Sequence, residues 1–453
     1  MKSLVPFLAL SVVAAHAETF SFHHENVLGT SLELRVSADS EATARQAEAS
    51  VLAEIDRLTA VLNTWSNDSE ISRWQASGKT AVVSADLAAV LKACDQWAAD
   101  SEGAFSVRVK ASAADMGTPA WTLDGTTATF TAKAGGITVD ALAKGYIIDR
   151  AVEKAAGVTG IALNIGGDLR VTGEQSIMIA DPRDDAENAA PLATVTLRDQ
   201  ALATSGDYRR GNHIIDPRSG KPATHIASAS VIAPDATTAD ALATIFNVLQ
   251  PSESLAMADA MPGVSCLIVS HDGGVFRSRA WREDRQQNML VAADAAPAFE
   301  MKVDFELDKP EAERYLRPYV AIWIEDKDDF PVRTLSLWLL KGEKGLRWLP
   351  DLKRWNRSDK TRRLADTTDI VPLITSATRN PGKYSVTWDG LDDNKKALPA
   401  GEYTLYIEAA REKGTYQIIK HPFKVGEAFT KDLGGNVEIK SASVDYQPKA
   451  AAN

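Results

Sequence analysis

The chain has 453 residues and a mass of 48.8 kDa, enough for two or three domains at about 100–200 residues each. Hydrophobic residues make up 45% and charged residues 25%, which excludes a disordered or fibrous protein. Acidic residues outnumber basic ones by 61 to 50, for a formal net charge of −11. This balance argues against general nucleic-acid binding, which needs clustered Lys and Arg, but it leaves room for a local basic pocket.

The first 17 residues have the pattern of a cleavable signal peptide. Lys2 supplies positive charge, and Leu4–Ala15 is apolar but shorter than the roughly 20 residues that span a bilayer. Ala15-His16-Ala17 fits a cleavage site, and no Cys follows it to carry a lipid. We therefore expect residues 1–17 to be removed and the mature protein to reach the periplasm. The alternative is a buried first helix.

Residues 18–290 mix helical and strand patterns and predict an α+β domain. Apolar residues recur every three or four positions over Glu41–Leu62, which predicts a long amphipathic helix. Further helices are predicted over Ala85–Ala99, Lys144–Ala156 and Thr238–Leu249, and strands over Gly160–Ile165, Ser176–Ala180, Ala193–Leu197, Ala227–Ile232 and Ser265–Ser270.

The composition changes after residue 290. The segment 291–298 is rich in small residues and is typical of a linker. Residues 299–428 hold alternating, β-rich runs separated by turns, which predict an all-β, immunoglobulin-like sandwich. Residues 429–453 are expected to form a polar, loosely held tail.

The two cysteines, Cys94 and Cys266, lie far apart and outside any metal-ligand spacing. An oxidising compartment would allow them to pair. Two buried, small, apolar side chains are the preferred interpretation, because free cysteine is among the most buried residue types.

Asp240 and Thr244 are four residues apart in a predicted helix, so their side chains share one face. A carboxylate and a hydroxyl, with nearby backbone carbonyls, form a hard oxygen set suited to Mg²⁺. The structural alternative is a capping box, because Thr237-x-x-Asp240 also fits that pattern. Taken alone, this motif favours the structural alternative.

His213 lies just before an apolar pair and the turn that begins at Asp216-Pro217. A histidine beside a carboxylate-bearing turn is suited to act as a general base near neutral pH. The alternative is a histidine that holds a loop in place through hydrogen bonds.

Three further segments are candidate ligand contacts. Lys144-Gly145 opens a predicted helix, where backbone N–H groups and a lysine can meet a phosphate; the alternative is a surface lysine. Gly166-Gly167 permits close approach by a ligand or by another backbone, but it matches neither the GxGxxG nor the GxxxxGK[ST] motif. Trp65 could stack on an aromatic ligand, or it could belong to a solvent-side turn.

The order of these motifs is more specific than any one of them. The series LNTWSNDSEISRW, AKGYIIDRA, LNIGGDLRVTG, IADPR, ATSGDYRR…HIIDPRSGKPA and ADALAT, over about residues 20–285, resembles the ApbE family of exported FAD:protein FMN transferases. The resemblance implies an ApbE-like, T-fold-related domain. It also implies a reaction in which FAD is cut at its diphosphate with Mg²⁺, FMN is joined to a threonine hydroxyl of a target protein, and AMP is released.

The resemblance also implies site residues. Asp240, Thr244 and the carbonyl of Ala141 correspond to metal ligands, with Asp240 also counted as catalytic. His213 corresponds to the base for the target threonine. The flavin contacts implied in this way are Leu28, Trp65, Ala104, Phe105, Ser106, Thr138, Lys144, Gly166 and Ile214.

Two positions depart from the family pattern. Ser106 stands where the GGAFD block has its Asp, and Thr138 aligns with the Asp of DLGGIAKG. The loss of a hydrogen-bond acceptor at Ser106 leaves two alternatives open: an FAD diphosphatase that gives FMN and AMP, or a non-catalytic periplasmic protein that binds flavin or docks a partner.

The expected partners follow from the same resemblance. They are FAD and an acceptor protein with a reactive Thr, expected to be a membrane-bound or periplasmic electron-transfer protein. No nucleic acid and no transmembrane segment in the mature chain are expected. The region after residue 299 resembles a small periplasmic β domain of unknown role that is fused to such transferases, and we expect it to dock a partner.

Overall fold

The structure, a computed structural model, describes residues 18–108, 115, 118–132, 136–184, 186–206, 214–284, 299–309, 315–339, 347–365, 370–394, 396–412 and 414–448. The chain divides into two compact units. The first comprises Met1–Ser176 and Thr196–Trp281, and the second comprises Ile177–Val195 and Arg282–Asn453. The expected signal peptide and the expected linker lie outside the described residues.

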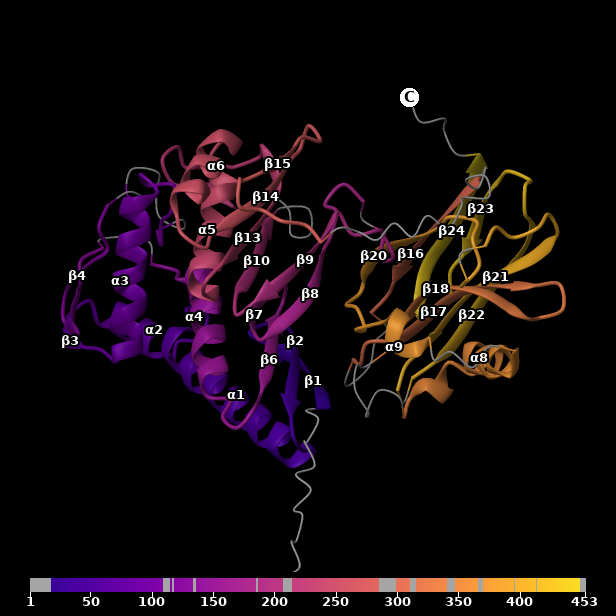
Figure 1. Cartoon of the computed structure of the whole chain (residues 1–453), viewed down its shortest axis with the longest axis horizontal. Helices are drawn as coiled ribbons and strands as arrows, with labels where there is room; N and C mark the ends of the chain where they lie inside the picture. The colour runs from indigo at the N-terminus through magenta and orange to yellow at the C-terminus, as the bar shows by residue number, and fades with distance from the viewer. Residues whose placement is uncertain are drawn as a thin grey trace, which may run out of the picture. The chain divides into compact units, whose positions relative to one another are not determined.

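An eight-stranded antiparallel sheet forms the centre of the first unit (Figure 1). Its strands, in spatial order, are β1 Glu18–Val27, β2 Thr30–Ala38, β6 Gly160–Ile165, β7 Asp168–Thr172, β10 Ala201–Gly206, β13 Ile226–Ala233, β14 Ser265–Ser270 and β15 Val275–Arg277. Buried and less buried residues alternate along β6, whereas β13 and β14 are buried along their whole length. The centre of the sheet is therefore covered more completely than its edge.

Helices cover one face of this sheet (Figure 1). They are α1 Glu41–Leu62, α4 Asp140–Glu153, α5 Ala236–Val248 and α6 Pro251–Ala260. Helix α1 buries Ala47, Val51 and Ile55 along one stripe, as its periodicity predicts. Helix α5 is buried on nearly all sides because it packs against α4, β10 and β13.

A smaller layer completes the first unit. It consists of α2 Glu70–Ser77, α3 Ala85–Asp100 and a three-stranded sheet of β3 Thr80–Val82, β4 Trp121–Asp124 and β5 Thr127–Phe130. Trp74 of α2 packs on Trp121 and Phe130, and its indole N–H donates to the Ala128 carbonyl at 3.3 Å. These aromatic contacts fix α2 on the small sheet.

Helix α4 begins at Asp140, one turn earlier than the Lys144 start that the sequence predicts. An acidic residue in the first turn is stabilised by the partial positive charge of a helix N-terminus. The Thr138 hydroxyl accepts the Asp140 N–H at 3.4 Å. As a result, Ala141 lies in the first turn of α4 and Lys144 in the second.

The second unit contains two sheets packed face to face over an apolar core. One sheet has the order β20-β16-β24-β23, with β16 Phe299–Leu307, β20 Gly382–Trp388, β23 Phe429–Gly434 and β24 Ile439–Pro448. The other has the order β19-β18-β17-β21-β22, with β17 Tyr319–Asp326, β18 Pro331–Trp338, β19 Thr375–Ser376, β21 Glu402–Ala410 and β22 Tyr416–Lys424. The two-layer prediction is confirmed, and the immunoglobulin-like topology stays a prediction.

The prediction of a polar tail after residue 428 is wrong. Strand β24 pairs with β16 along its length, and β23 pairs with β24. Ile439, Ala442 and Val444 of β24 are buried in the core of the sandwich. The alternating polar residues face outward, which makes this segment polar in composition although it is an integral strand.

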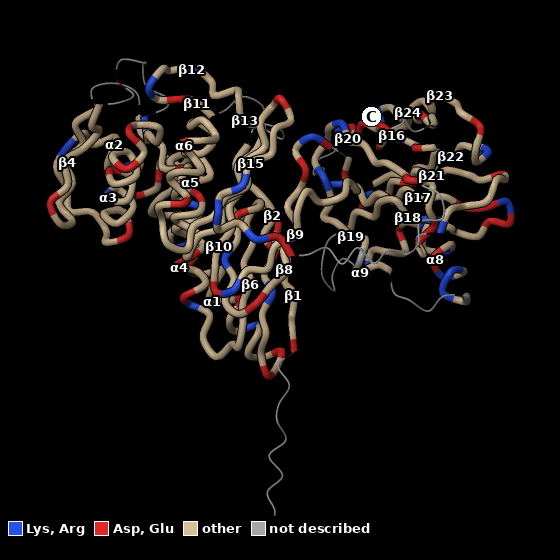
Figure 2. Tube along the Cα trace, turned by 45° about the horizontal axis from the view of Figure 1, so that its top comes forward, with Lys and Arg blue, Asp and Glu red and all other residues tan. Residues whose placement is uncertain are grey.

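The prediction of a C-terminal β domain is confirmed, and the structure adds helices that cover the outer face of its five-stranded sheet. They are the 3₁₀ turn η1 Leu349–Asp351, α8 Lys353–Ala365 and α9 Val371–Ile374. Helix α8 is rich in Lys and Arg, shown in blue in Figure 2, and Trp355 is its large buried apolar residue. So few apolar positions produce no helical periodicity in the sequence.

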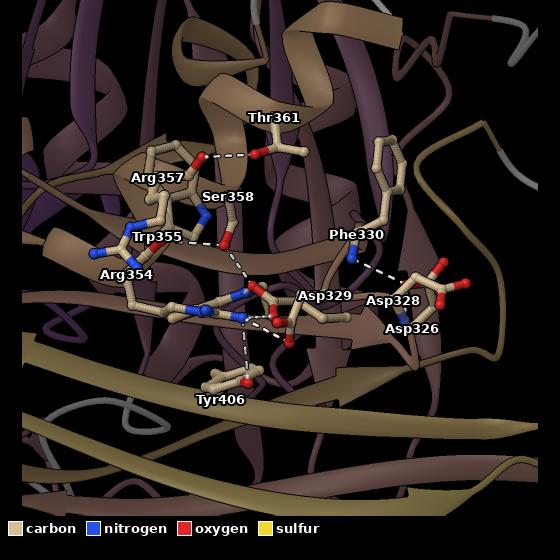
Figure 3. A network of polar contacts seen from close by, with 12 residues as sticks. Asp326, Asp328, Asp329, Phe330, Arg354, Trp355, Arg357, Ser358, Thr361 and Tyr406 are labelled. Carbon is tan, nitrogen blue, oxygen red and sulfur yellow. Dashed lines mark hydrogen bonds and ion pairs between the residues drawn. The ribbon is translucent and has the colours of Figure 1, made fainter.

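Two fully buried glutamates, Glu325 and Glu408, attach α8 to the sheet. The Glu408 carboxylate accepts the backbone N–H groups of Arg354 and Trp355, both at 2.8 Å. Glu325 contacts the Arg354 guanidinium and the Ser358 hydroxyl, which point into the same network (Figure 3). Glu408 thus satisfies the N–H groups that a helix start leaves unpaired.

Strands β8 Glu174–Ile179 and β9 Ala193–Arg198 form a two-stranded sheet, and the residues that connect them belong to the second unit. Glu187 pairs with Arg379 at 2.7 Å, and its backbone N–H donates to the Ser385 carbonyl at 2.8 Å. The Asn188 side chain accepts the Thr387 N–H at 2.8 Å. These bonds extend along β20, an edge strand, and cover it.

Candidate active site

The start of helix α5 is held by two carboxylates. Asp235, its N-cap residue, accepts the Thr238 N–H at 2.7 Å. Asp149 reaches across from α4 and accepts the N–H groups of Ala236 and Thr237, both at 2.8 Å. Burial raises the pKa of Asp149. These bonds fix α5 against α4, and with it the side chains that α5 carries.

Gly145 allows α4 and α5 to approach closely. A Cβ atom at this position would lie 2.2 Å from the Ala236 carbonyl oxygen, so no larger residue fits without movement of the backbone. The Gly145 N–H donates to Asp240 Oδ2 at 3.0 Å. Asp240 therefore bonds across to α4, and the capping-box interpretation of Thr237-x-x-Asp240 is wrong.

Asp240 belongs to a buried charged cluster with Asp168 and Lys144. The Lys144 ammonium lies 2.6 Å from Asp168 Oδ2, and Asp168 is 2% exposed and Asp240 4%. Burial, followed by the charge of Asp168, raises the pKa of Asp240 well above its usual range. Two carboxylates against one ammonium leave the ionised cluster with an excess of negative charge.

The turn between β6 and β7 places Asp168 in this cluster. Gly166 and Gly167 have φ values of 62° and 101°, as a tight two-residue hairpin turn requires. Asn164 Oδ1 accepts the Gly167 N–H at 3.0 Å. The paired glycines were predicted as a candidate ligand contact, whereas Asp168 was not predicted as a site residue; a carboxylate directly after such a turn was the available signal.

A second group of predicted residues meets at the start of α4. The Trp65 indole N–H donates to Asp140 Oδ2 at 3.1 Å, and the Thr64 hydroxyl donates to Asp140 Oδ1 at 3.2 Å. The Thr138 hydroxyl lies 3.5 Å from that of Thr64. Trp65 is 75% exposed, so its ring presents a large apolar surface beside the first turn of α4.

The segment that corresponds to the GGAFD block lies next to Thr138, whose N–H donates to the Val107 carbonyl at 2.8 Å. Ala104 and Phe105 are buried in the core. The Ser106 hydroxyl accepts the Arg108 N–H at 3.1 Å, so it stabilises a local turn at the position where the family pattern has Asp.

The remaining predicted residues lie on other elements. Leu28 has a positive φ of 48° in the turn between β1 and β2. A Cβ at Gly166 would lie 2.7 Å from the Thr30 side chain, so the close approach of β2 explains the glycine without a ligand. Ile214 is half-buried, and its carbonyl accepts the Ala223 N–H at 2.9 Å. His213 lies outside the described residues.

Asn247 links α5 to β10. Its side-chain amide donates to the Ser205 carbonyl at 3.0 Å and to the Ala243 carbonyl at 2.8 Å. Ser205 lies near the end of β10, and the described part of that strand ends at residue 206. The helix that carries Asp240 and Thr244 is thus bonded directly to β10, a contact that no local sequence pattern predicts.

The donor set fits Mg²⁺. Asp240, the half-buried Thr244 one turn later and the Ala141 carbonyl offer hard oxygens, and the charge of Asp168 and Asp240 favours a divalent cation when both are ionised. Over the described ranges, no group of three or more His, Cys, Asp or Glu is placed to hold a metal. A cation here would depend on few protein ligands and would keep several waters.

Two family models match the chain. The ApbE family model matches residues 28–268, and a model described as a predicted periplasmic protein (DUF2271) matches residues 300–441. In the part of the chain that the structure describes, no helix has both the length and the apolar character to cross a membrane.

Similar proteins carry a consistent name. A Haemophilus influenzae protein named FAD:protein FMN transferase is 29% identical over 318 residues, which cover 59% of this chain and 92% of that protein. A Treponema pallidum protein of the same name is 33% identical over 163 residues, which cover 30% of this chain and 44% of that protein.

Solved structures share the fold of the first unit. The crystal structure of the ApbE protein from Thermotoga maritima matches with a TM-score of 0.52 and 25% identity, over 58% of this chain and 97% of that one. The apo form of Pseudomonas stutzeri flavinyl transferase ApbE matches with a TM-score of 0.51 and 24% identity, over 58% and 96%. Together with the family model, which covers more than half of the sequence, these similarities show that the chain belongs to the ApbE family.

Proposed function

We propose that this protein transfers FMN from FAD to a threonine hydroxyl of an exported target protein and releases AMP, with Mg²⁺ as the cation. The similar proteins named FAD:protein FMN transferase support the transfer. The observation that carries the proposal is the buried cluster of Asp240, Asp168 and Lys144, because an excess of carboxylate beside a lysine suits a divalent cation and a diphosphate.

In the proposed reaction the threonine oxygen attacks the phosphorus of the FMN half of FAD. The new O–P bond forms as the bond to the AMP oxygen breaks, and the hydroxyl proton passes to His213. Asp240, Thr244 and the Ala141 carbonyl would hold Mg²⁺, which neutralises diphosphate charge when bound. Lys144 adds positive charge beside the diphosphate, and Trp65 offers its exposed ring to the flavin.

Hydrolysis is the second candidate, and Ser106 favours it. Its hydroxyl is shorter than the carboxylate of the family pattern, carries no negative charge and already accepts the Arg108 N–H. Looser holding of FAD would let water replace the threonine hydroxyl and would give FMN and AMP. A protein that only binds flavin would release neither product.

One experiment separates these outcomes. The mature protein is incubated with FAD, Mg²⁺ and a candidate acceptor, and both in-gel flavin fluorescence and AMP are measured. Labelled acceptor with AMP supports transfer, and AMP without labelled acceptor supports hydrolysis. The absence of both products would contradict an enzymatic role.

The proposed setting is the periplasm, on the strength of the signal-peptide pattern and of the match to a predicted periplasmic protein family. The target would then be an exported electron-transfer protein. Cell fractionation of the tagged chain tests the compartment, and recovery in the cytoplasm at the unprocessed mass would contradict it.

A further inference from the structure

The cluster of Lys144, Asp168 and Asp240 brings together three elements that lie apart in the sequence. Lys144 is in α4, Asp168 begins β7, and Asp240 is in α5. Only Asp240 is implied as a cation ligand by the family pattern, so Asp168 needs its own explanation. Its side chain is buried and is 2.6 Å from the Lys144 ammonium, so it does not act as a solvated surface acid.

We propose that Asp168 is a positioning residue that competes with the FAD diphosphate for the Lys144 ammonium and so makes FAD binding depend on the divalent cation. This inference rests on the proposed function. In the structure the ammonium lies 2.6 Å from Asp168 Oδ2, and the neighbouring Gly145 N–H donates to Asp240 at 3.0 Å. An ammonium in this position is committed to a carboxylate and is less available to a diphosphate.

Charge balance gives the direction of the effect. When Asp240 binds a divalent cation, the cation neutralises the negative charge of the two carboxylates in place of the Lys144 ammonium. The cation also repels the ammonium. Lys144 has a flexible four-carbon stem and a quarter-exposed side chain, so it can turn from Asp168 to an incoming phosphate. Cation binding and FAD binding should therefore favour each other, and by linkage the coupling is the same in both directions.

The test measures FAD affinity by the change in flavin fluorescence, with and without saturating Mg²⁺, in the full mature chain. Asp168→Asn keeps the shape of the side chain but releases Lys144. We expect it to bind FAD about tenfold more tightly than the wild type when Mg²⁺ is absent, because a hydrogen bond to a charged group no longer competes. The enhancement of FAD binding by Mg²⁺ should shrink correspondingly.

Two further variants show whether Lys144 transmits the effect. Lys144→Met should weaken FAD binding, and the double variant Asp168→Asn with Lys144→Met should behave like Lys144→Met alone. Glu153→Gln removes the same charge from an exposed position of α4, and FAD affinity should stay at the wild-type value. Thermal unfolding of each variant shows whether it is folded.

A merely structural role for Asp168 would give the opposite result: Asp168→Asn would weaken FAD binding equally with and without Mg²⁺, and this would overturn the inference. The readout is FAD binding, so the inference and the proposed transfer can fail separately. If the variants bind FAD as expected but no acceptor is labelled, the inference stands and the proposed transfer fails. If the wild type binds no FAD at saturating Mg²⁺, both fail.

Discussion

The Asp149 carboxylate closes the start of α5, the helix that carries Asp240. It accepts two backbone N–H groups and the Thr237 hydroxyl, the last at 2.6 Å. Because these donors are partly buried, removal of the acceptor would leave them unpaired. The geometry of the site thus depends on a residue that belongs to a different helix from the one it caps.

Asp149→Ala is expected to lower the free energy of unfolding by about 2 kcal/mol, since a helix cap is lost and buried donors stay unsatisfied. Urea unfolding followed by circular dichroism measures this loss. Asp124→Ala, at an exposed position of β4, is the matched control and should stay within about 0.5 kcal/mol of the wild type. Equal stability of the two variants would contradict the capping role.

The same residue predicts a pH dependence. Burial raises the folded pKa of Asp149 above its ordinary value of 3.8, so the folded state binds the proton more tightly than the unfolded state. The contribution of Asp149 to the free energy of unfolding is therefore largest below the unfolded pKa of 3.8 and decreases as the pH rises from there through the folded pKa. The stability difference between the wild type and Asp149→Asn should be larger at about pH 4 than at about pH 7, and the reverse trend would contradict this assignment.

Asp240→Ala is expected to abolish both labelled acceptor and AMP, because Asp240 is the one carboxylate among the three donors proposed to hold the cation. Both products are measured at saturating Mg²⁺, with Asp124→Ala as control. Full activity of the variant, or of the wild type in a chelator, would contradict the role of Asp240.

At the scale of the elements, local patterns predicted some of the helices and strands of the first unit, and β1, β2, β7 and β10 were not among them. The predicted bounds of α1, β6 and β14 agree with the structure. The start of α4 was missed because Thr138 and Asp140 stabilise it through local polar bonds that carry no apolar period. Helix α8 was missed because its attachment depends on two buried glutamates of the neighbouring sheet.

The site was predictable only in part. Asp240 and Thr244 share a helix face that spacing alone indicates, and the family pattern added Ala141. The bond from Gly145 to Asp240 joins residues 95 positions apart, and no local pattern predicts such a contact. Asp168 entered the cluster through the turn at Gly166-Gly167, which was interpreted as a ligand contact.

Glu408→Gln is expected to destabilise the second unit by about 1–2 kcal/mol. Each carboxylate oxygen of Glu408 accepts one backbone N–H at the start of α8, whereas an amide has a single acceptor oxygen and no negative charge. Urea unfolding and proteolysis of α8 measure the effect. Glu427→Gln, at an exposed position, is the control. If both variants unfold alike, Glu408 does not hold α8.

At the scale of the whole molecule, the second unit is built from two stretches of chain. Residues 177–195 leave the first unit and bond to β20, and the sequence returns to the second unit only after residue 281. The domain bounds predicted from composition treat the chain as a simple succession, because composition does not show which strand edge a hairpin will cover.

Deletion of residues 299–453 is expected to retain AMP release but to slow modification of the native target, since the second unit is proposed to dock it. The deletion also removes the partners of Glu187 and Asn188, so a second variant should replace residues 180–192 by a short turn. AMP release and target labelling are compared in both variants. Equal labelling rates with and without the second unit would contradict a docking role.

The second unit is made of two separate stretches of the chain, and this has an evolutionary consequence. A gene fusion with one junction appends a complete module, but here a single crossover near residue 290 would separate β20 from the loop that covers its edge. The exchange of this module between proteins would therefore require two compatible junctions. The loop at 180–192 and the strand it covers are expected to be inherited together.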